Sequence, residues 1–448
     1  MTTLREITSV LNATLFGDDI EFQGVSTDSR QTQNQQLFFA LSGPNFDGHD
    51  FVANAAAMGA VAAVVTHRVD VDIPQLVVAD TTIALGQLAA KHRQQFNMPI
   101  VAITGSCGKT TTTAMLASIF RQCGKTLSPL GSFNNHIGLP LTLLQLDESY
   151  QYVVLELGAN HLNEIDYLVK IAQPDVAAVT MIAAVHLAGF GSIENIALAK
   201  GEIFNALSSD SVAVTNADDP YSKMWDKKLA GHRVVSFGSS AKSDVSARNI
   251  VTKPDGLVQF QLMTSQNELT IDLPLLGEHN VQNALAAAAC AYAIGVSAAV
   301  IKQGLEQMVA VEKRLVRHRL ANGTVLIDDS YNANPLAVKA AMVVLQGEGQ
   351  HTTLVLGDMG ELGENAEQFH IEIGLWARQT GIDQLFTYGT LTAHAAQAFG
   401  EKGQHFTDKE ALVKALAPTL TVESAVLVKG SKSMKMWHIV EALLERQG

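Results

Sequence analysis

The chain has 448 residues, more than one hydrophobic core supports, so we expect roughly two to four domains. Its 31 Lys and Arg against 44 Asp and Glu give a formal net charge of −13, which argues against nucleic acid or an anionic membrane as the main partner. The three cysteines lack metal-ligand spacing and the first residues lack the apolar core of a signal peptide, which together indicate a cytoplasmic protein. Two uncharged stretches, 176–193 and 284–301, are not apolar enough to indicate membrane insertion.

The first part of the chain alternates short predicted strands with helices. We expect strands at 20–25, 37–41, 61–65 and 76–78, and helices from about residue 50 and over 81–96. Two polar loops, 26–30 and 42–49, follow strands, where an α/β sheet usually presents its ligand contacts. Arg30 suits an anionic group, and Asp47 and His49 suit a sugar or a base. The alternative is ordinary loop chemistry, with a helix N-cap at Asp47 or Asp50.

A glycine turn between a strand and a helix follows a predicted hinge at 97–99. The apolar run 100–103 predicts a buried strand, Gly105 and Gly108 permit a tight turn, and Lys109 opens an amphipathic helix that extends to residue 120. Such a turn aims backbone N–H groups at one point beside a helix N-terminus and a lysine, which favours a bound polyphosphate. A hydroxyl for a magnesium ion on the phosphates would come from Thr110 or Thr111.

This turn departs from the general P-loop spacing. The general pattern has a glycine six residues before Lys109, where Ile103 stands, so the loop is a shortened variant. The alternative is an ordinary turn between strand and helix with a surface lysine. We favour nucleotide phosphate binding because an apolar strand precedes the glycines and a helix follows them.

More polar side chains are expected at the same edge of this second sheet. The predicted strand 152–157 has Glu156 near its end, and in a parallel sheet that end faces the same edge as the P-loop. A carboxylate there is placed to bind magnesium held by phosphates, with a strand-end salt bridge as the alternative. Amide and imidazole side chains flank this strand in the loop 131–140 and after residue 158, namely Asn134, Asn135, Asn160 and His161.

The remainder of the second part carries several isolated candidates. His186 follows a predicted strand at 176–181, although a lone histidine is more often a packing residue, and a helix from Ser192 contains Lys200. Short strands between residues 233 and 275 indicate an accessory sheet. Asn283 suits adenine recognition by paired amide hydrogen bonds, and the alternative for this segment is helix capping by Asn280.

The last part again alternates strand, polar loop and helix. A basic segment, 313–319, is either a solvated face or the source of an arginine that neutralises a transferred phosphoryl group. Predicted strands at 325–327, 353–356 and 425–428 run into polar loops at 328–335, 357–363 and 429–431. The alternation is that of a dinucleotide-type fold, but no Gly-x-Gly-x-x-Gly follows the first strand.

Taken in order, these motifs resemble the Mur ligases, ATP-dependent amide-forming enzymes of bacterial cell-wall synthesis. The motifs are the short P-loop, Glu156, His186, Lys200, the run Gly-x-His-Asn-x-x-Asn at 277–283 and the run Asp-Asp-Ser-Tyr-Asn-Ala-Asn-Pro at 328–335. The resemblance covers the whole chain and implies a three-domain α/β protein. A small N-terminal α/β domain (1–97) would bind the UDP substrate, a central P-loop domain with a parallel mononucleotide-binding sheet (98–311) would bind ATP, and a C-terminal Rossmann-like domain (312–448) would bind the incoming dipeptide and contact ATP.

The resemblance also implies a role for each motif residue. Phosphate and nucleotide contacts would come from Gly105, Ser106, Gly108, Lys109, Thr110, Thr111, Asn283 (adenine), Asp329 (ribose) and Arg314 (γ-phosphate). Two magnesium ions would be held by Thr110, Glu156, His186 and Lys200, the last of these as a carbamate. Substrate contacts would come from Thr27, Asp28, Ser29, Arg30, Asn45, Asp47, Gly48, His49, Asn134, Asn135, Asn160, His161, Tyr331, Asn332 and Asn334. Catalysis would rest on Lys109, His186, Lys200 and Arg314.

Within the family, the runs 328–335 and 357–363 are similar to those of members that add D-alanyl-D-alanine to UDP-N-acetylmuramoyl-tripeptide. The implied reaction passes through an acyl phosphate, and the implied enzyme is a monomer. One alternative is another ligase of the superfamily, such as folylpolyglutamate synthase, against which the paired N-terminal loops suited to UDP argue. The other is a nucleotide-switched regulatory GTPase, which the absence of an Asn-Lys-x-Asp motif disfavours.

Overall fold

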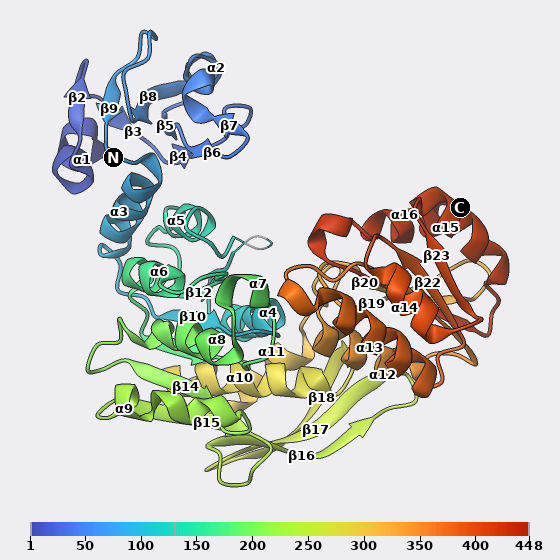
Figure 1. Ribbon diagram of the computed structural model, residues 1–448. Helices are drawn as coiled ribbons and strands as arrows, with labels where there is room; N and C mark the ends of the chain where they lie inside the picture. Colours follow the sequence, from blue (N-terminus) through green and yellow to red (C-terminus); the bar gives the residue numbers. More distant parts are fainter. Residues whose placement is uncertain (1, 130, 132, 447–448) are drawn as a thin grey trace.

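Three β-sheets organise the chain. The computed structural model describes residues 2–129, 131 and 133–446. The main sheets have five, nine and six strands, and each of the three predicted domain ranges contains one of them. Figure 1 shows the N-terminal domain joined to the central domain through helix α3 (Thr81–Arg93), with the C-terminal domain beside the central one. Within the described residues, no helix is both long and apolar enough to cross a membrane.

The N-terminal sheet is small and mostly parallel. Its strand order is β2-β9-β8-β5-β4, with only β2 antiparallel to its neighbour. The predicted strand 20–25 was wrong as a single element, because Gly24 takes a φ of 77° and divides it between two sheets. The elements are β1 (Thr2–Thr3), α1 (Leu4–Leu11), β2 (Thr14–Phe16), β3 (Glu21–Phe22), β4 (Val25–Ser26), β5 (Gln36–Phe39), β6 (Ser42–Gly43), β7 (Phe46–Asp47), η1 (Gly48–Phe51), α2 (Val52–Met58), β8 (Ala60–Val65) and β9 (Gln75–Val77).

The central sheet follows the order β11-β12-β10-β13-β14-β15-β16-β17-β18 and is parallel up to β16. Strands β16, β17 and β18 are antiparallel but belong to the same sheet, so the predicted separate accessory sheet was wrong. The strands are β10 (Ile100–Thr104), β11 (Thr126–Leu127), β12 (Tyr152–Glu156), β13 (Val176–Val179), β14 (Val212–Asn216), β15 (Arg233–Gly238), β16 (Val245–Thr252), β17 (Leu257–Thr264) and β18 (Glu268–Leu276).

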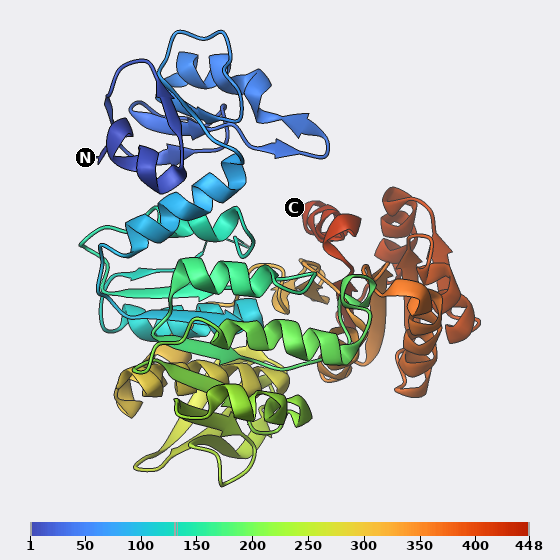
Figure 2. The ribbon, with the colours of Figure 1, turned by 60° about the vertical axis from the view of Figure 1, so that its left-hand side comes forward.

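Both faces of this sheet are covered, which explains its continuous apolar strands. In β10, Val101 and Ile103 pack into the core under α4, α10 and α11, while Ile100 and Ala102 pack under α5, α6 and α8. The helices are α4 (Lys109–Arg121), α5 (Gly138–Leu143), α6 (Glu164–Ala172), α7 (Leu187–Phe190), α8 (Ile193–Lys200), η2 (Gly201–Phe204), η3 (Pro220–Trp225), α9 (Asp226–Leu229), α10 (His279–Ile294) and α11 (Ala298–Glu306). Figure 2 shows these helices on the two sides of the sheet.

The C-terminal sheet follows the order β19-β20-β24-β21-β22-β23 and is parallel except at its edge strand β19. Two apolar cores, one on each face, fit the predicted Rossmann-like alternation. The elements are β19 (Val316–Arg319), β20 (Val325–Asp329), α12 (Pro335–Gln346), β21 (His351–Gly357), η4 (Gly363–Asn365), α13 (Ala366–Gln379), β22 (Gln384–Tyr388), α14 (Thr392–Phe399), β23 (Gly403–Phe406), α15 (Lys409–Leu416), η5 (Ala417–Thr419), β24 (Ser424–Lys429), η6 (Lys432–Met434) and α16 (Trp437–Glu445).

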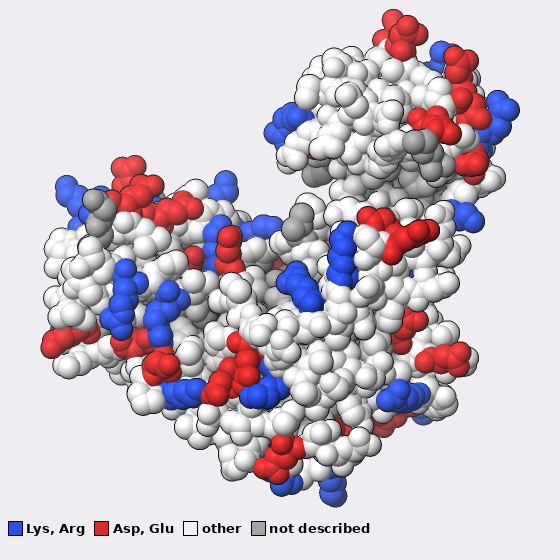
Figure 3. All heavy atoms as spheres, turned by 180° about the vertical axis from the view of Figure 1, so that it is seen from behind, with Lys and Arg blue, Asp and Glu red and all other residues white. Residues whose placement is uncertain are grey.

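Helix α3 is the main connection of the N-terminal domain to the rest of the molecule. Its Leu85 and Leu88 belong to the N-terminal core, whereas Ala89 belongs to the core of the central domain. At its end, Arg93 donates to the backbone oxygens of Ala172 and Gln173 after α6, each at 3.0 Å. The N-terminal domain stands apart from the C-terminal domain. Figure 3 shows a hollow in the molecular surface between these two domains.

Candidate functional site

The P-loop lies at the end of β10, where two glycines bring the backbone close to its neighbours. Gly105 has a φ of 147°, and a Cβ there would lie 2.0 Å from Thr180 Oγ1. Gly108 has a φ of 82°, and a Cβ there would lie 2.1 Å from Asn283 Oδ1. Lys109 Nζ donates to Gly105 O at 2.8 Å, so the lysine folds back over the loop. The turn therefore has the open backbone cradle and adjacent cation that a polyphosphate requires.

The loop is anchored to the segment that follows β13. Ser106 N donates to Met181 O at 2.8 Å, and Ser106 Oγ both donates to Ala183 O at 3.1 Å and accepts from Ala183 N at 2.9 Å. Thr180 Oγ1 donates to Cys107 O at 2.6 Å. Ser106 thus fixes the loop through both its hydroxyl and its backbone N–H.

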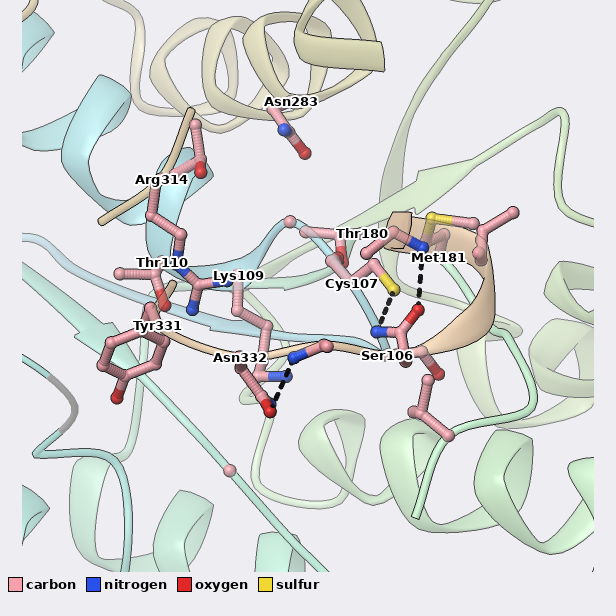
Figure 4. A pocket seen from close by; sticks show the side chains of 18 of the residues that line it. Ser106, Cys107, Lys109, Thr110, Thr180, Met181, Asn283, Arg314, Tyr331 and Asn332 are labelled. Carbon is pink, nitrogen blue, oxygen red and sulfur yellow. Dashed lines mark hydrogen bonds between the residues drawn. The ribbon is translucent and has the colours of Figure 1, made fainter. Parts of the chain in front are cut away.

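A cavity of about 930 Å³ opens between the central and C-terminal domains. Figure 4 shows Lys109, Arg314, Tyr331 and Asn332 gathered around it from both domains. Of the predicted site residues, it is lined by Ser106, Gly108, Lys109, Thr110, Thr111, Asn134, Asn135, Glu156, Asn160, His186, Asn283, Arg314, Asp329, Tyr331, Asn332 and Asn334. The predicted residues that do not line it are Gly105, His161, Lys200, Thr27, Asp28, Ser29, Arg30, Asn45, Asp47, Gly48 and His49.

Glu156 lies at the P-loop edge, as its place in the parallel sheet predicts. It pairs in register with Ile103 of β10, and its side chain is only 3% exposed. Asn134 Nδ2 donates to Glu156 Oε1 at 2.7 Å. No ion pair of Glu156 occurs among the described residues, so the alternative of a strand-end salt bridge was wrong. A buried carboxylate close to a phosphate cradle is a site for a cation.

Lys200 is buried directly behind the cavity wall. Its side chain is 1% exposed, and Nζ donates to Ala159 O at 3.3 Å and lies 5.3 Å from the ring centre of Phe190. Burial, followed by the charge of Lys109, lowers the pKa of Lys200 to about 7. A large fraction of this amine is therefore neutral, and nucleophilic, at physiological pH.

His186 joins the two domains that form the cavity. It lies just before α7, and its Nδ1 is in close contact with Glu361 Oε2 from the loop that follows β21. His186 therefore lies where the central and C-terminal domains meet.

The loop after β20 faces the P-loop across the cavity. Asn334 Oδ1 accepts from Ala337 N at 2.9 Å and so caps α12, while its Nδ2 donates to Cys107 Sγ at 3.5 Å. The guanidinium of Arg314 stacks 4.3 Å from the ring centre of Tyr331. Asp329 Oδ2 accepts from the buried Lys429 Nζ at 2.5 Å. The C-terminal domain thereby brings the Asp329–Lys429 charge pair and an aromatic ring stacked with Arg314 to the P-loop.

Asn283 reaches the cavity from α10. Its Nδ2 donates to Asn280 Oδ1 at 2.8 Å, and Asn280 Nδ2 donates to Leu276 O at 2.8 Å. Since α10 begins at His279, Asn280 lies inside the helix, and the alternative of capping by Asn280 was wrong. Asn280 instead orients Asn283.

The polar loops of the N-terminal domain lie apart from this cavity and are internally bonded. Arg30 Nε and Nη2 donate to both carboxylate oxygens of Asp28, at 2.9 and 2.8 Å. Asp47 Oδ1 accepts from His49 N at 3.0 Å, which confirms the alternative of an N-cap at Asp47. His49 Nε2 accepts from Thr66 N at 2.9 Å. His49 therefore shapes the loop, and Arg30 carries its charge on an exposed intraloop pair.

Three family models match the chain in succession. They are described as the Mur ligase family catalytic domain, over residues 21–104, the Mur ligase middle domain, over 103–291, and the Mur ligase glutamate ligase domain, over 313–432. The chain is also 43% identical to the UDP-N-acetylmuramoyl-tripeptide–D-alanyl-D-alanine ligase of Escherichia coli K12, covering 99% of this chain and 98% of that protein. The chain belongs to the Mur ligase family.

Other relatives give the same result. The ligase of the same description from Bacillus subtilis is 35% identical, with 99% of this Mur ligase and 98% of that protein covered. A crystal structure of MurF from Acinetobacter baumannii superimposes with a TM-score of 0.92 at 36% identity, covering 99% and 98% of the two chains. The MurF ligase of Thermotoga maritima, solved in complex with ADP, gives 0.84 at 26% identity, covering 95% and 99%. This Mur ligase therefore has the MurF-type three-domain architecture.

Several residues that shape the site of this Mur ligase were not predicted. Lys429 and Glu361 line the cavity; Lys429 ends β24, and Glu361 lies in the loop after β21. Glu202 accepts from the backbone nitrogens of Asn163 and Asp166 at 2.7 and 3.1 Å and so holds the start of α6. For Lys429 and Glu361, the available sequence signal was their position in the polar loops predicted after strands. No local sequence pattern marks Glu202.

Proposed function

We propose that this Mur ligase joins D-alanyl-D-alanine to UDP-N-acetylmuramoyl-tripeptide, using ATP and releasing ADP and phosphate. The relatives just described carry the name of this reaction at 43% and 35% identity over nearly their whole length. The observation that carries the proposal is the contact of Asn334 with Cys107, which sets the loop 328–335 against the P-loop inside one cavity. We also propose that the enzyme acts as a monomer in the cytoplasm.

ATP would lie with its phosphates on the P-loop and its adenine toward α10. The phosphates would meet the backbone of Gly105 and Gly108 on either side of Ser106, with Lys109 and Arg314 as cations. Asn283, oriented by Asn280, would read the adenine edge, and Asp329 would accept from the ribose. Since Asp329 Oδ2 is bonded to Lys429, Oδ1 is the oxygen assigned to the ribose.

Magnesium fits this site as a companion of the phosphates. Among the described residues there is no group of three or more His, Cys, Asp or Glu placed to hold a metal alone. Magnesium in nucleotide sites needs only one or two protein oxygens, because phosphates and water supply the rest. The buried carboxylate of Glu156 and the hydroxyl of Thr110 or Thr111 meet this requirement for one ion, and His186 with Lys200 would hold a second. Bound magnesium supplies charge neutralisation of the transferred phosphoryl group.

The reaction would proceed in two balanced steps. An oxygen of the tripeptide carboxylate attacks the γ-phosphorus, the bond to the β-phosphate oxygen breaks, and ADP leaves. The amino group of the dipeptide then attacks the carbonyl carbon of the acyl phosphate, loses a proton, and expels phosphate to leave the amide. Lys109 and Arg314 spread the negative charge that develops on the transferred group.

Lys200 would act as a carbamate. Its neutral amine attacks carbon dioxide, a C–N bond forms, and one proton is released, which converts the neutral amine into an anion able to support a metal. The burial of Lys200 and its pKa of about 7 make the neutral amine available for this addition.

The substrate would bridge the N-terminal domain and the cavity. The UDP group would bind the loops 27–30 and 45–49, the muramoyl-peptide would pass Asn134, Asn135, Asn160 and His161, and Tyr331, Asn332 and Asn334 would seat the dipeptide. Because these groups lie on three domains, the domains would close around the substrates, which excludes water from the acyl phosphate.

A coupled phosphate-release assay tests the proposal. Purified protein is supplied with ATP and with each pairing of UDP-muramoyl peptides and candidate amines, including D-alanyl-D-alanine, D-glutamate and lysine. We expect phosphate release only with UDP-N-acetylmuramoyl-tripeptide and D-alanyl-D-alanine together, with the pentapeptide product found by mass spectrometry. Equal release without the dipeptide, or a preference for folate and glutamate, would disprove it.

A further inference from the structure

The proposed dipeptide has a negative charge that none of its proposed contacts neutralises. D-alanyl-D-alanine carries an amine, which reacts, and a terminal carboxylate, which does not. A carboxylate that leaves water for a cavity needs a cation or several hydrogen-bond donors. None of the side chains proposed to seat the dipeptide, Tyr331, Asn332 and Asn334, is a cation. A further group of the cavity must therefore meet the carboxylate.

Among the described residues, four lysine or arginine side chains line the cavity. Lys109 and Arg314 are the cations proposed for the ATP phosphates, and Lys429 is buried in its bond with Asp329. The fourth is Lys432, which is exposed and begins η6, just after β24. Three histidines also line the cavity, but all belong to the central domain, namely His136, His186 and His279. Lys432 is therefore the exposed cation that shares a domain with the dipeptide residues and lies outside the ATP contacts.

Lys432 lies beside the ring of Tyr331. Its Nζ is 5.6 Å from the ring centre, and the guanidinium of Arg314 is 4.3 Å from the same centre. Figure 4 shows Tyr331 next to Arg314 and Asn332 in the cavity. One ring thus contacts the cation proposed for the transferred phosphoryl group and a second cation. A dipeptide laid along Tyr331 would have its amine toward the acyl phosphate and its carboxylate toward Lys432.

The loop that presents Lys432 has a fixed backbone and two hydroxyl groups. Ser431 N donates to Asp358 O at 2.9 Å, and Ser431 O accepts from Met434 N at 2.9 Å. The hydroxyls of Ser431 and Ser433 are 3.2 Å apart, and both residues line the cavity. When one hydroxyl donates to the other, the accepting hydroxyl keeps a proton that it can donate to a substrate oxygen. The loop therefore offers an ammonium group and a hydroxyl donor, a combination that suits a carboxylate.

We propose that Lys432, with the hydroxyls of Ser431 and Ser433, binds the terminal carboxylate of the incoming dipeptide and so determines which amines are accepted. The inference rests on the proposed function in one respect, that D-alanyl-D-alanine is the amine substrate. It names a residue to which neither the family motifs nor the sequence patterns gave a role.

Binding of the carboxylate at Lys432 also selects for the length of the amine substrate. One residue of extended chain spans about 3.5 Å. D-alanine held by the same cation would therefore leave its amine about 3.5 Å from the position that the amine of the dipeptide occupies, too far to attack the acyl phosphate.

The test compares D-alanyl-D-alanine with D-alanyl-D-alaninamide, which has the same length but no terminal charge. Phosphate release is measured at saturating ATP and UDP-N-acetylmuramoyl-tripeptide. We expect wild type to have a KM for the amide about 10-fold or more above that for the acid, as for loss of one hydrogen bond to a charged group. Lys432→Met should raise the KM for the acid to about that for the amide, with the KM for the amide and for ATP little changed. Lys432→Arg should keep the preference for the acid.

Lys409→Met is the matched control. Lys409 also lies over a tyrosine ring of the C-terminal domain, 5.1 Å from the centre of Tyr388, but it does not line the cavity. This variant makes the same change and should keep the wild-type preference, and thermal unfolding checks that each variant is folded.

Three outcomes would overturn the inference. They are equal use of acid and amide by wild type, an unchanged preference for the acid in Lys432→Met, and an equal loss with both substrates, which would indicate a structural role for the lysine. No ligation of the dipeptide by wild type would instead contradict the proposed function, and the inference with it.

Discussion

Gly108 and Asn283 meet so closely that a methyl group on Gly108 would stand 2.1 Å from Asn283 Oδ1. The first residue belongs to the P-loop and the second to α10, which starts after the last strand of the central sheet. The nucleotide site therefore depends on the position of α10, which is distant in sequence, as much as on the P-loop itself.

Gly108→Ala should raise the KM for ATP at least about 10-fold, because the new Cβ displaces Asn283 and the residue is held at a φ of 82°. Gly295→Ala separates these two effects, since Gly295 has a φ of 91° with nothing within 4 Å of its added Cβ. We expect the control to lose some thermal stability while keeping the KM for ATP. Steady-state kinetics and thermal unfolding check both variants, and a similar KM change in the control would contradict the explanation by contact.

Lys200→Met should raise the unfolding temperature at pH 7. The folded pKa of about 7 lies below the value near 10.4 of an unfolded chain, so between these limits the unfolded state binds more protons and stability rises with pH. The increase in unfolding temperature caused by Lys200→Met is therefore greatest near pH 7 and becomes smaller toward pH 10. Lys170→Met, at an exposed position, should show no such trend. A gain that is constant with pH would show that Lys200 titrates normally.

Lys200→Ala should abolish ligation and regain part of it with added short carboxylic acids. The space left by the side chain admits a small carboxylate, which supplies the anionic oxygens of the proposed carbamate. Phosphate release is measured with increasing acetate or propionate, and the wild type under the same acids corrects for salt effects. No recovery at any acid concentration would contradict the carbamate.

Lys429→Met should destabilise the C-terminal domain by about 3–5 kcal/mol, the range for a buried charge left without its partner. Asp329 and Lys429 are 6% and 1% exposed, so water cannot replace the lost bond. The double variant Asp329→Asn with Lys429→Met should recover much of this loss, because no unpaired charge remains. Urea unfolding of the single and double variants measures the coupling; additive losses would show that the pair contributes nothing.

Gly86→Ala should raise the KM for the UDP substrate and leave that for ATP unchanged. A Cβ on Gly86 of α3 would lie 2.2 Å from the Tyr167 hydroxyl of α6, so the Tyr167 side chain or helix α3, and with it the N-terminal domain, must shift. Tyr167→Phe removes this oxygen and should restore part of the KM in the double variant. Equal changes in both KM values would show that the effect is not confined to the N-terminal domain.

The edge of the central sheet was predictable, whereas its contacts across domains were not. The carboxyl ends of parallel strands meet at one edge of a sheet, so the strand pattern alone places Glu156 beside the P-loop. The contact of Asn334 with Cys107 joins residues 227 positions apart, and no local pattern encodes such a pairing. The same holds for Glu361, whose loop was recognised as polar but whose partner lies in another domain.

The predicted accessory sheet shows a second limit. The predicted short strands are present, and in β17 buried residues alternate with partly buried ones. Whether those strands start a new sheet or extend the old one is decided by the parallel pairing of Phe237 with Val245, a contact of tertiary structure. Likewise, Asn280 has the chemistry of a helix cap, but the helix begins two residues earlier than that role requires.

The link through α3 has a consequence for which molecules can react. None of the predicted residues of the N-terminal loops lines the cavity, and helix α3, which packs on α6 at Gly86 and Arg93, is the main connection between the two parts. A substrate bound at both ends would have to span the distance that remains when the domains have closed. The enzyme would measure the length of the peptide on its carrier as well as read its chemistry, and a carrier one residue too short would be held with its carboxylate out of reach of ATP.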